Sequence, residues 1–150
     1  MSYLWGVAFM LFEEIIKEKI SADHLLYVSL KYTKTCDVIL NLLSRWKIMI
    51  DTSFGFLIKK AGKSWKPVPD APRAKVMQLR KIYSNEPVVM DALDLYEFFR
   101  DIEGLEKARE SEFRKGVNLR VIYKGKVVNI NLEQLALYSQ ILERFISYLK

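Results

Sequence analysis

The feature that most constrains the fold is a long apolar stripe between residues 25 and 50. Its members are three or four residues apart, the spacing that places side chains on one face of an α-helix. They are Leu25, Val28, Tyr32, Cys36, Ile39, Leu43, Trp46 and Ile50. The stripe predicts one long helix that begins after Ser21, whose hydroxyl can cap the first turn. Tyr32 and Trp46 are therefore expected in the core.

Four polar residues lie beside this stripe, namely Tyr27, Thr33, Thr35 and Asn41. They could contact a ligand, or they could make hydrogen bonds where a second helix packs. Polar side chains next to an apolar face are usually satisfied within the protein. We therefore interpret them as the edge of a packed seam.

Three further segments before residue 116 have helical periodicity. The first helix is expected over about 2–19, a third from Pro72 to about Tyr83 with Asp70 as its cap, and a fourth from Pro87 towards Lys115. Ser84 or Asn85 is expected to cap the fourth helix. A proline-rich connector precedes the third helix, because proline fixes φ and removes a backbone donor.

The period changes near the C-terminal end. Apolar residues alternate over 117–130, and Lys124-Gly125 lies where a two-residue hairpin turn is needed. Asn131 and Gln134 then form a capping pattern for a final helix over 132–149. The sequence predicts a single domain over 1–150, mainly α: a bundle of about five helices over about 2–115, with one C-terminal β-hairpin.

Composition narrows the class of protein. A hydrophobic content of 51% in 150 residues excludes a disordered chain. The single cysteine, Cys36, predicts a reducing compartment and hence a cytoplasmic location. The apolar run that begins the chain ends at Glu13 and is too short to span a bilayer, so no membrane role is expected.

Familiar catalytic motifs are absent from the sequence. It contains no glycine-rich phosphate loop, no HExxH and no nucleophile elbow. Cys36 lies within an apolar stripe, which favours a core role, and His24 is the only histidine. Asp91, Asp94, Glu97 and Asp101 recur at helical spacing but lack partner histidines, so we interpret them as a solvated face. We expect no catalytic residues, no bound metal and no cofactor.

The net charge of +6 raises the possibility of nucleic-acid binding. Residues 63–85 hold six Lys or Arg against one acidic residue, whereas residues 86–113 hold three against nine. The acidic segment could pair with its basic neighbours and leave little external field. If the basic segments 63–81 and 114–126 are free, the binding surface is predicted to contain Lys63, Lys66, Arg73, Arg80, Lys81, Arg114, Arg120 and Lys124.

The stretch "LLYVSLKYTKTCDVILNLL", in a basic helical protein of this length, resembles the HEPN-type helical bundles of archaea and bacteria over about residues 1–115. Active ribonucleases of that family carry an Arg followed about four to six residues later by a His. This chain has no histidine after His24. The resemblance therefore implies a dimeric binding or partner module that is not a nuclease, with a nucleotidyltransferase as one kind of partner.

Three function classes remain open from the sequence. The first is a non-catalytic helical module that forms a homodimer or docks a partner protein. The second is a binder of RNA or a nucleotide that uses the basic segments, where Trp65 and Tyr123 lie among Lys and Arg. The third is an enzyme with an unusual site in a cleft of the bundle. Salt-dependent RNA binding would distinguish the second class from the first.

Overall fold

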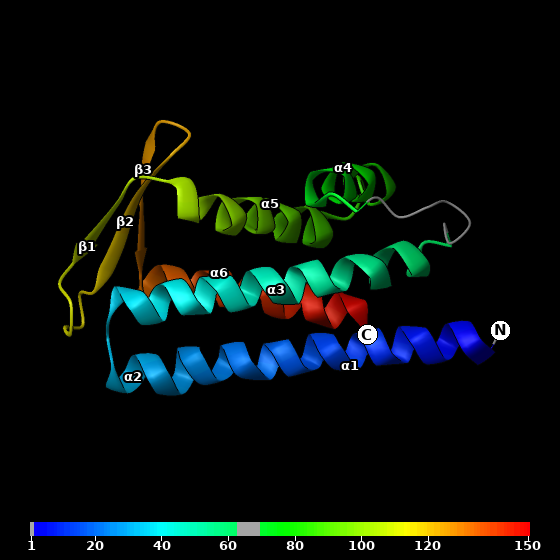
Figure 1. Cartoon of the computed structure of the whole chain (residues 1–150), viewed down its shortest axis with the longest axis horizontal. Coiled ribbons are helices and arrows are strands. Elements are labelled where there is room, and N and C mark those ends of the chain that lie inside the picture. The colour runs from blue at the N-terminus through cyan, green and yellow to red at the C-terminus, as the bar shows by residue number, and fades with distance from the viewer. Residues whose placement is uncertain (1, 63–69) are drawn as a thin grey trace.

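A computed structural model describes residues 2–62 and 70–150 and has helices stacked side by side with a small sheet across one end (Figure 1). Helix α1 (Ser2–His24) runs antiparallel to α3 (Cys36–Lys60), and this is the most extensive helix contact. Helix α5 (Pro87–Asp101) packs against both α3 and α6 (Leu132–Leu149). Helix α4 (Pro72–Ile82) covers α3 and α5. The predicted mainly α fold is confirmed.

The first helix is longer than predicted and continues through Ser21. It passes through a π-helical turn, η1 (Leu25–Ser29), into α2 (Leu30–Tyr32) before the chain leaves the helix. At Thr33 the backbone is extended, with φ −132° and ψ 92°. The prediction of one helix from residue 22 to beyond residue 50 was therefore wrong.

Helix α3 begins directly after Thr35, because the Thr35 side chain caps its first turn. Thr35 Oγ1 accepts a hydrogen bond from the backbone N–H of Val38 at 3.3 Å. The spacing from Tyr32 to Cys36 is four residues, so the apolar period continues across the break and hides it. Tyr32 is 78% exposed rather than buried, whereas Trp46 is 3% exposed, as predicted.

The interpretation of the neighbouring polar residues as a packed seam was also wrong for most of them. Tyr27 is 61% exposed, and Thr33 and Asn41 are exposed as well. Thr35 alone is buried, and its role is the helix cap.

The fourth predicted helix ends near residue 104 instead of Lys115. Helix α5 is followed by a short 3-10 turn, η2 (Ile102–Gly104), and then by strand β1 (Lys107–Glu110). The Lys107 ammonium donates to the backbone carbonyls of Ile102, Glu103 and Leu105 at 2.9–3.1 Å. These bonds satisfy carbonyls at the end of the helix, where the backbone lacks partners.

The C-terminal sheet has three antiparallel strands in the order β1-β2-β3, one more than the predicted hairpin. Strands β2 (Asn118–Tyr123) and β3 (Lys126–Asn131) form that hairpin in the predicted register, with Leu119 opposite Ile130. At the turn, Lys124 and Gly125 have φ of 52° and 78°, as a type I′ turn requires.

The predicted final helix over 132–149 is confirmed as α6. Asn131 Oδ1 accepts the backbone N–H of Gln134 at 2.9 Å and caps the first turn. Its apolar stripe is buried: Leu135, Tyr138, Leu142, Phe145 and Leu149. The caps predicted for the third and fourth helices are not used, because α4 begins after Ala71 and α5 begins after Glu86. Proline nevertheless occupies the first position of both helices.

An aromatic cluster joins the three central helices. Trp46 of α3 stacks on Phe99 of α5 with 5.9 Å between ring centroids, and it meets the edge of Tyr138 of α6 at 6.5 Å. Phe98 of α5 reaches Tyr123 of β2 at 4.7 Å. The same cluster therefore holds the sheet against the helices.

Candidate functional site

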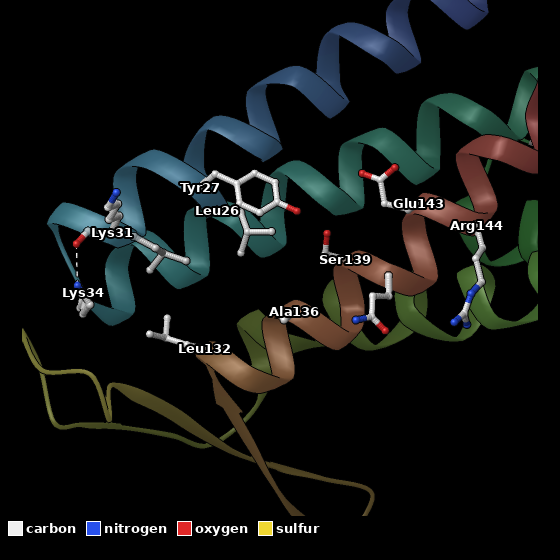
Figure 2. A pocket seen from close by; sticks show the side chains of 11 residues that line it. Leu26, Tyr27, Lys31, Lys34, Leu132, Ala136, Ser139, Glu143 and Arg144 are labelled. Carbon is white, nitrogen blue, oxygen red and sulfur yellow. Dashed lines mark hydrogen bonds between the residues drawn. The ribbon is translucent and has the colours of Figure 1, made fainter.

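A groove lies between the end of the first helix and α6. Helix α1 packs on α3, whereas α6 packs on α5 and β3. The continuation of the first helix through η1 and α2 forms one wall, and α6 forms the other. The groove has a volume of about 680 Å³ (Figure 2). One wall is formed by Leu26, Tyr27, Leu30, Lys31 and Lys34. The other is formed by Leu132, Ala136, Ser139, Gln140, Glu143 and Arg144.

The groove is apolar inside and basic at its edges. Leu26, Leu132 and Ala136 are among its apolar lining residues, and Figure 2 shows Leu26 on one wall and Leu132 and Ala136 on the other. Lys31 and Lys34 lie at one end, and Arg144 lies on α6 towards the other. A ligand with an apolar face and negative charge at its edges would match this chemistry.

The single carboxylate of the groove is already paired. Lys19 of α1 contacts Glu143 of α6 at 2.8 Å and Asp23 at 2.7 Å. Burial lowers the pKa of Lys19, but its bonds to Asp23 and Glu143 raise it more, so the net pKa lies above the ordinary value. The Lys19–Glu143 pair connects the first helix with α6. Lys31, Lys34 and Arg144 therefore give the edges of the groove a positive charge.

The π-helical turn η1 shapes one wall. The Leu30 N–H bonds to the Leu25 carbonyl, five residues earlier, which widens the helix by one residue. The extra residue changes the direction of the side chains that follow, and Tyr27 and Val28 are both exposed. Such turns occur frequently at functional sites.

The residues predicted to form a basic surface do not come together. Helix α4, with Arg73, Arg80 and Lys81, covers α3 and α5 away from the sheet, which carries Arg120 and Lys124 at the opposite end of the bundle (Figure 1). Arg114 lies in the turn between β1 and β2. Lys63 and Lys66 lie outside the described residues.

Two of these cations, Arg80 and Arg120, are also paired with carboxylates. Arg80 contacts Asp94 at 2.8 Å and Glu97 at 3.0 Å, and these bonds raise its pKa although burial opposes the change. Arg120 lies 3.7 Å from Glu110. The acidic segment therefore neutralises part of its basic neighbours, as the sequence had allowed.

The acidic face of α5 forms ion pairs with Arg80 of α4. Asp94 and Glu97 are the partners of Arg80, and within residues 2–62 and 70–150 no three His, Cys, Asp or Glu side chains gather closely enough to hold a metal ion. In the same part of the chain, no helix has an apolar stretch long enough to cross a membrane.

Comparison with known proteins yields no relative for this chain. No protein-family description matches it, and neither the curated proteins nor the solved structures that were searched contain a match. Its own geometry is therefore the basis for assigning a function.

Proposed function

We propose that this protein is a non-catalytic docking module whose groove binds an amphipathic helix of a partner protein. The observation that carries the proposal is an apolar groove between two helices, with Lys31, Lys34 and Arg144 at its edges and its one carboxylate, Glu143, held by Lys19. Helices bind such grooves through an apolar face with residues spaced at i, i+3, i+4 and i+7.

The edges indicate the charge of the partner. Acidic side chains beside the apolar stripe of the partner helix would meet three cations, and this complementarity favours the correct partner and suppresses basic ones. The residues that line the groove include neither histidine nor cysteine, and the one carboxylate among them, Glu143, is held by Lys19. Docking accounts for this lining better than catalysis does.

A matched pair of variants tests the groove. Ala136→Glu places a carboxylate inside it, whereas Leu137→Glu places the same group one residue away on α6, outside the lining. The probe is a designed helix of roughly 18 residues, about five turns, with a leucine stripe flanked by glutamates. We expect Ala136→Glu to weaken its binding at least about tenfold, because the new charge must be desolvated. Leu137→Glu should have little effect, measured by fluorescence anisotropy.

Two control peptides show whether shape and charge both matter. One has the same composition in an order that destroys the apolar stripe, and the other has lysine in place of glutamate. Both should bind more weakly than the first peptide. Equal binding of all three, or equal loss in both protein variants, would contradict helix docking in this groove.

A second surface supports the predicted homodimer. Phe9 and Ile20 are 62% and 64% exposed on α1, and they are eleven residues apart, close to three full turns, so they share one face. Glu13 and Lys17 lie between them and are also exposed. An antiparallel pair of α1 helices centred near position 15 would bring Phe9 to Ile20, and Glu13 to Lys17, of the second copy.

Charge reversal tests this dimer. Glu13→Lys should weaken association because it places like charges opposite each other, and Glu13→Lys with Lys17→Glu should restore it. Phe9→Lys with Ile20→Lys should produce a monomer. Light scattering over a micromolar concentration series measures each state. A wild-type protein that is monomeric throughout this series would rule out the α1 dimer.

The HEPN resemblance remains a proposal and suggests one partner class. In that reading, the partner helix would belong to a nucleotidyltransferase. The cytoplasmic location likewise remains a prediction from cysteine content.

A further inference from the structure

Two turns meet at the end of the bundle that carries the sheet. One is the turn between α2 and α3, and the other is the turn between β1 and β2 (Figure 1). The Phe113 N–H donates to the Lys34 carbonyl at 2.7 Å. The Cys36 N–H contacts both carboxylate oxygens of Glu112 at 3.3 Å. Two segments about 80 residues apart in the sequence are therefore fixed to each other.

An aromatic ring is exposed at each turn: Tyr32 is the last residue of α2, just before the first turn, and Phe113 lies in the second. Tyr32 is 78% exposed and Phe113 is 76% exposed, more than any other large hydrophobic side chain with a described exposure. Phe113 and Ser111 have φ of 66° and 55°, a left-handed conformation that is uncommon outside glycine. Such conformations persist where the surroundings enforce them, and they concentrate at functional sites. The fold thus holds the Phe113 ring outside the core.

Four cations are close in sequence to these two rings. Lys31 lies in α2 and Lys34 in the turn that follows it, while Arg114 and Lys115 follow Phe113 directly in the second turn. The Lys31 ammonium lies 5.9 Å from the centroid of the Tyr32 ring. Lys34, Arg114 and Lys115 belong to the two turns that the Phe113–Lys34 hydrogen bond joins, and Lys31 lies in α2 just before the first of them.

The carboxylates beside these turns have partners. Asp37 pairs with Arg109 at 2.8 Å, and Glu112 accepts the Cys36 N–H. These four cations and Arg109 outnumber Asp37 and Glu112, so the region has a net positive charge. We name the six residues Tyr32, Phe113, Lys31, Lys34, Arg114 and Lys115 the aromatic-basic end.

We propose that the aromatic-basic end binds single-stranded nucleic acid. Exposed rings can stack on unpaired bases of any sequence, while nearby cations neutralise phosphates. An acidic peptide would use the cations but would leave both exposed rings without a flat partner. The proposal goes beyond helix docking, although Lys31 and Lys34 also border the groove. Of the residues that the sequence suggested for nucleic-acid binding, only Arg114 belongs to this end.

The rings supply the first test. The probe is a fluorescein-labelled oligouridylate of roughly 12 nucleotides, followed by anisotropy at about 50 mM salt. Tyr32→Ala and Phe113→Ala should each weaken binding about tenfold, the range that stacking on one base provides. Phe113→Tyr should retain affinity because it keeps the ring. Val127→Ala, which truncates a 51% exposed apolar side chain on β3, is the matched control and should change nothing.

The cations supply an independent readout. For single strands, the logarithm of the binding constant falls with the logarithm of salt concentration by about 0.7 for each neutralised phosphate. Lys34→Gln with Arg114→Gln should therefore reduce the slope by about 1.4, whereas removal of the rings should leave it unchanged. Circular dichroism confirms that each variant is folded.

The competing occupant is an acidic peptide. An oligoglutamate that displaces the RNA at equal charge, together with affinity that ignores both ring substitutions, would overturn the proposal in favour of a protein partner. Absence of oligouridylate binding at about 50 mM salt would also overturn it. Neither result depends on Ala136, so helix docking in the groove is tested independently of nucleic-acid binding.

Discussion

Trp46→Ala is expected to lower the free energy of unfolding by about 3–5 kcal/mol, the range for large aromatic truncations in cores. Trp46 is 3% exposed and contacts Phe99 and Tyr138, so its removal leaves a cavity where α3, α5 and α6 meet. Equilibrium unfolding in urea measures the change. A loss below about 1 kcal/mol would mean that the cluster repacks or that Trp46 does not join the three helices.

Tyr32→Ala is the matched control for this measurement. The sequence places Tyr32 on the same stripe as Trp46, yet in the structure its ring is 78% exposed. We expect a change within about 0.5 kcal/mol, as for surface substitutions away from special features. A large loss of stability in Tyr32→Ala would indicate that Tyr32 is buried, as the prediction of a single long helix requires. It would contradict the turn at Thr33–Thr35.

Local signals explain which elements could be predicted. The hairpin depends on Lys124-Gly125 and on alternation in its own two strands, and the final helix depends on Asn131 and a stripe within its own length. These features need no knowledge of distant segments. The break after Tyr32 is different, because periodicity continues across it and the contacts that fix it come from Glu112 and Phe113.

Strand β1 could not be found from its own residues. Its four residues, Lys107–Glu110, are exposed or half-buried and show no alternation. It is a strand because β2 offers backbone partners, with Lys107 opposite Val121. A charged segment of this kind is as compatible with a polar helix as with an edge strand until its partner is known.

The candidate sites depend on packing in the same way. Leu30 and Ser139 follow ordinary helical patterns, and only the separation of α1 from α6 makes them parts of a groove. Arg80 resembles a free cation until α5 supplies Asp94 and Glu97. One signal was available: Phe113 stands alone in the charged run "EKARESEFRK", where a core role is hard to satisfy.

Cys36 is expected to resist alkylation when the protein is folded. Burial, and then the Glu112 carboxylate, raise the pKa of its thiol from the ordinary 9.0 to about 11. Its S–H also donates to the Asn118 carbonyl at 3.3 Å. Because the thiolate is the nucleophile, this pKa alone lowers the reactive fraction about a hundredfold near pH 8, and burial slows access further. We expect labelling by iodoacetamide at least about a hundredfold slower than in urea.

The same pKa gives a stability prediction with a defined sign. The folded protein favours the protonated thiol, so its contribution to stability is complete below about pH 9 and is lost as pH rises through about 11. Cys36→Ser should remove this part of the alkaline loss. Glu112→Gln should speed labelling, because it removes a charge that disfavours the thiolate. If Cys36 of the folded protein is labelled as fast as in urea, the two turns open freely. This result would also contradict the fixed arrangement of Tyr32 and Phe113.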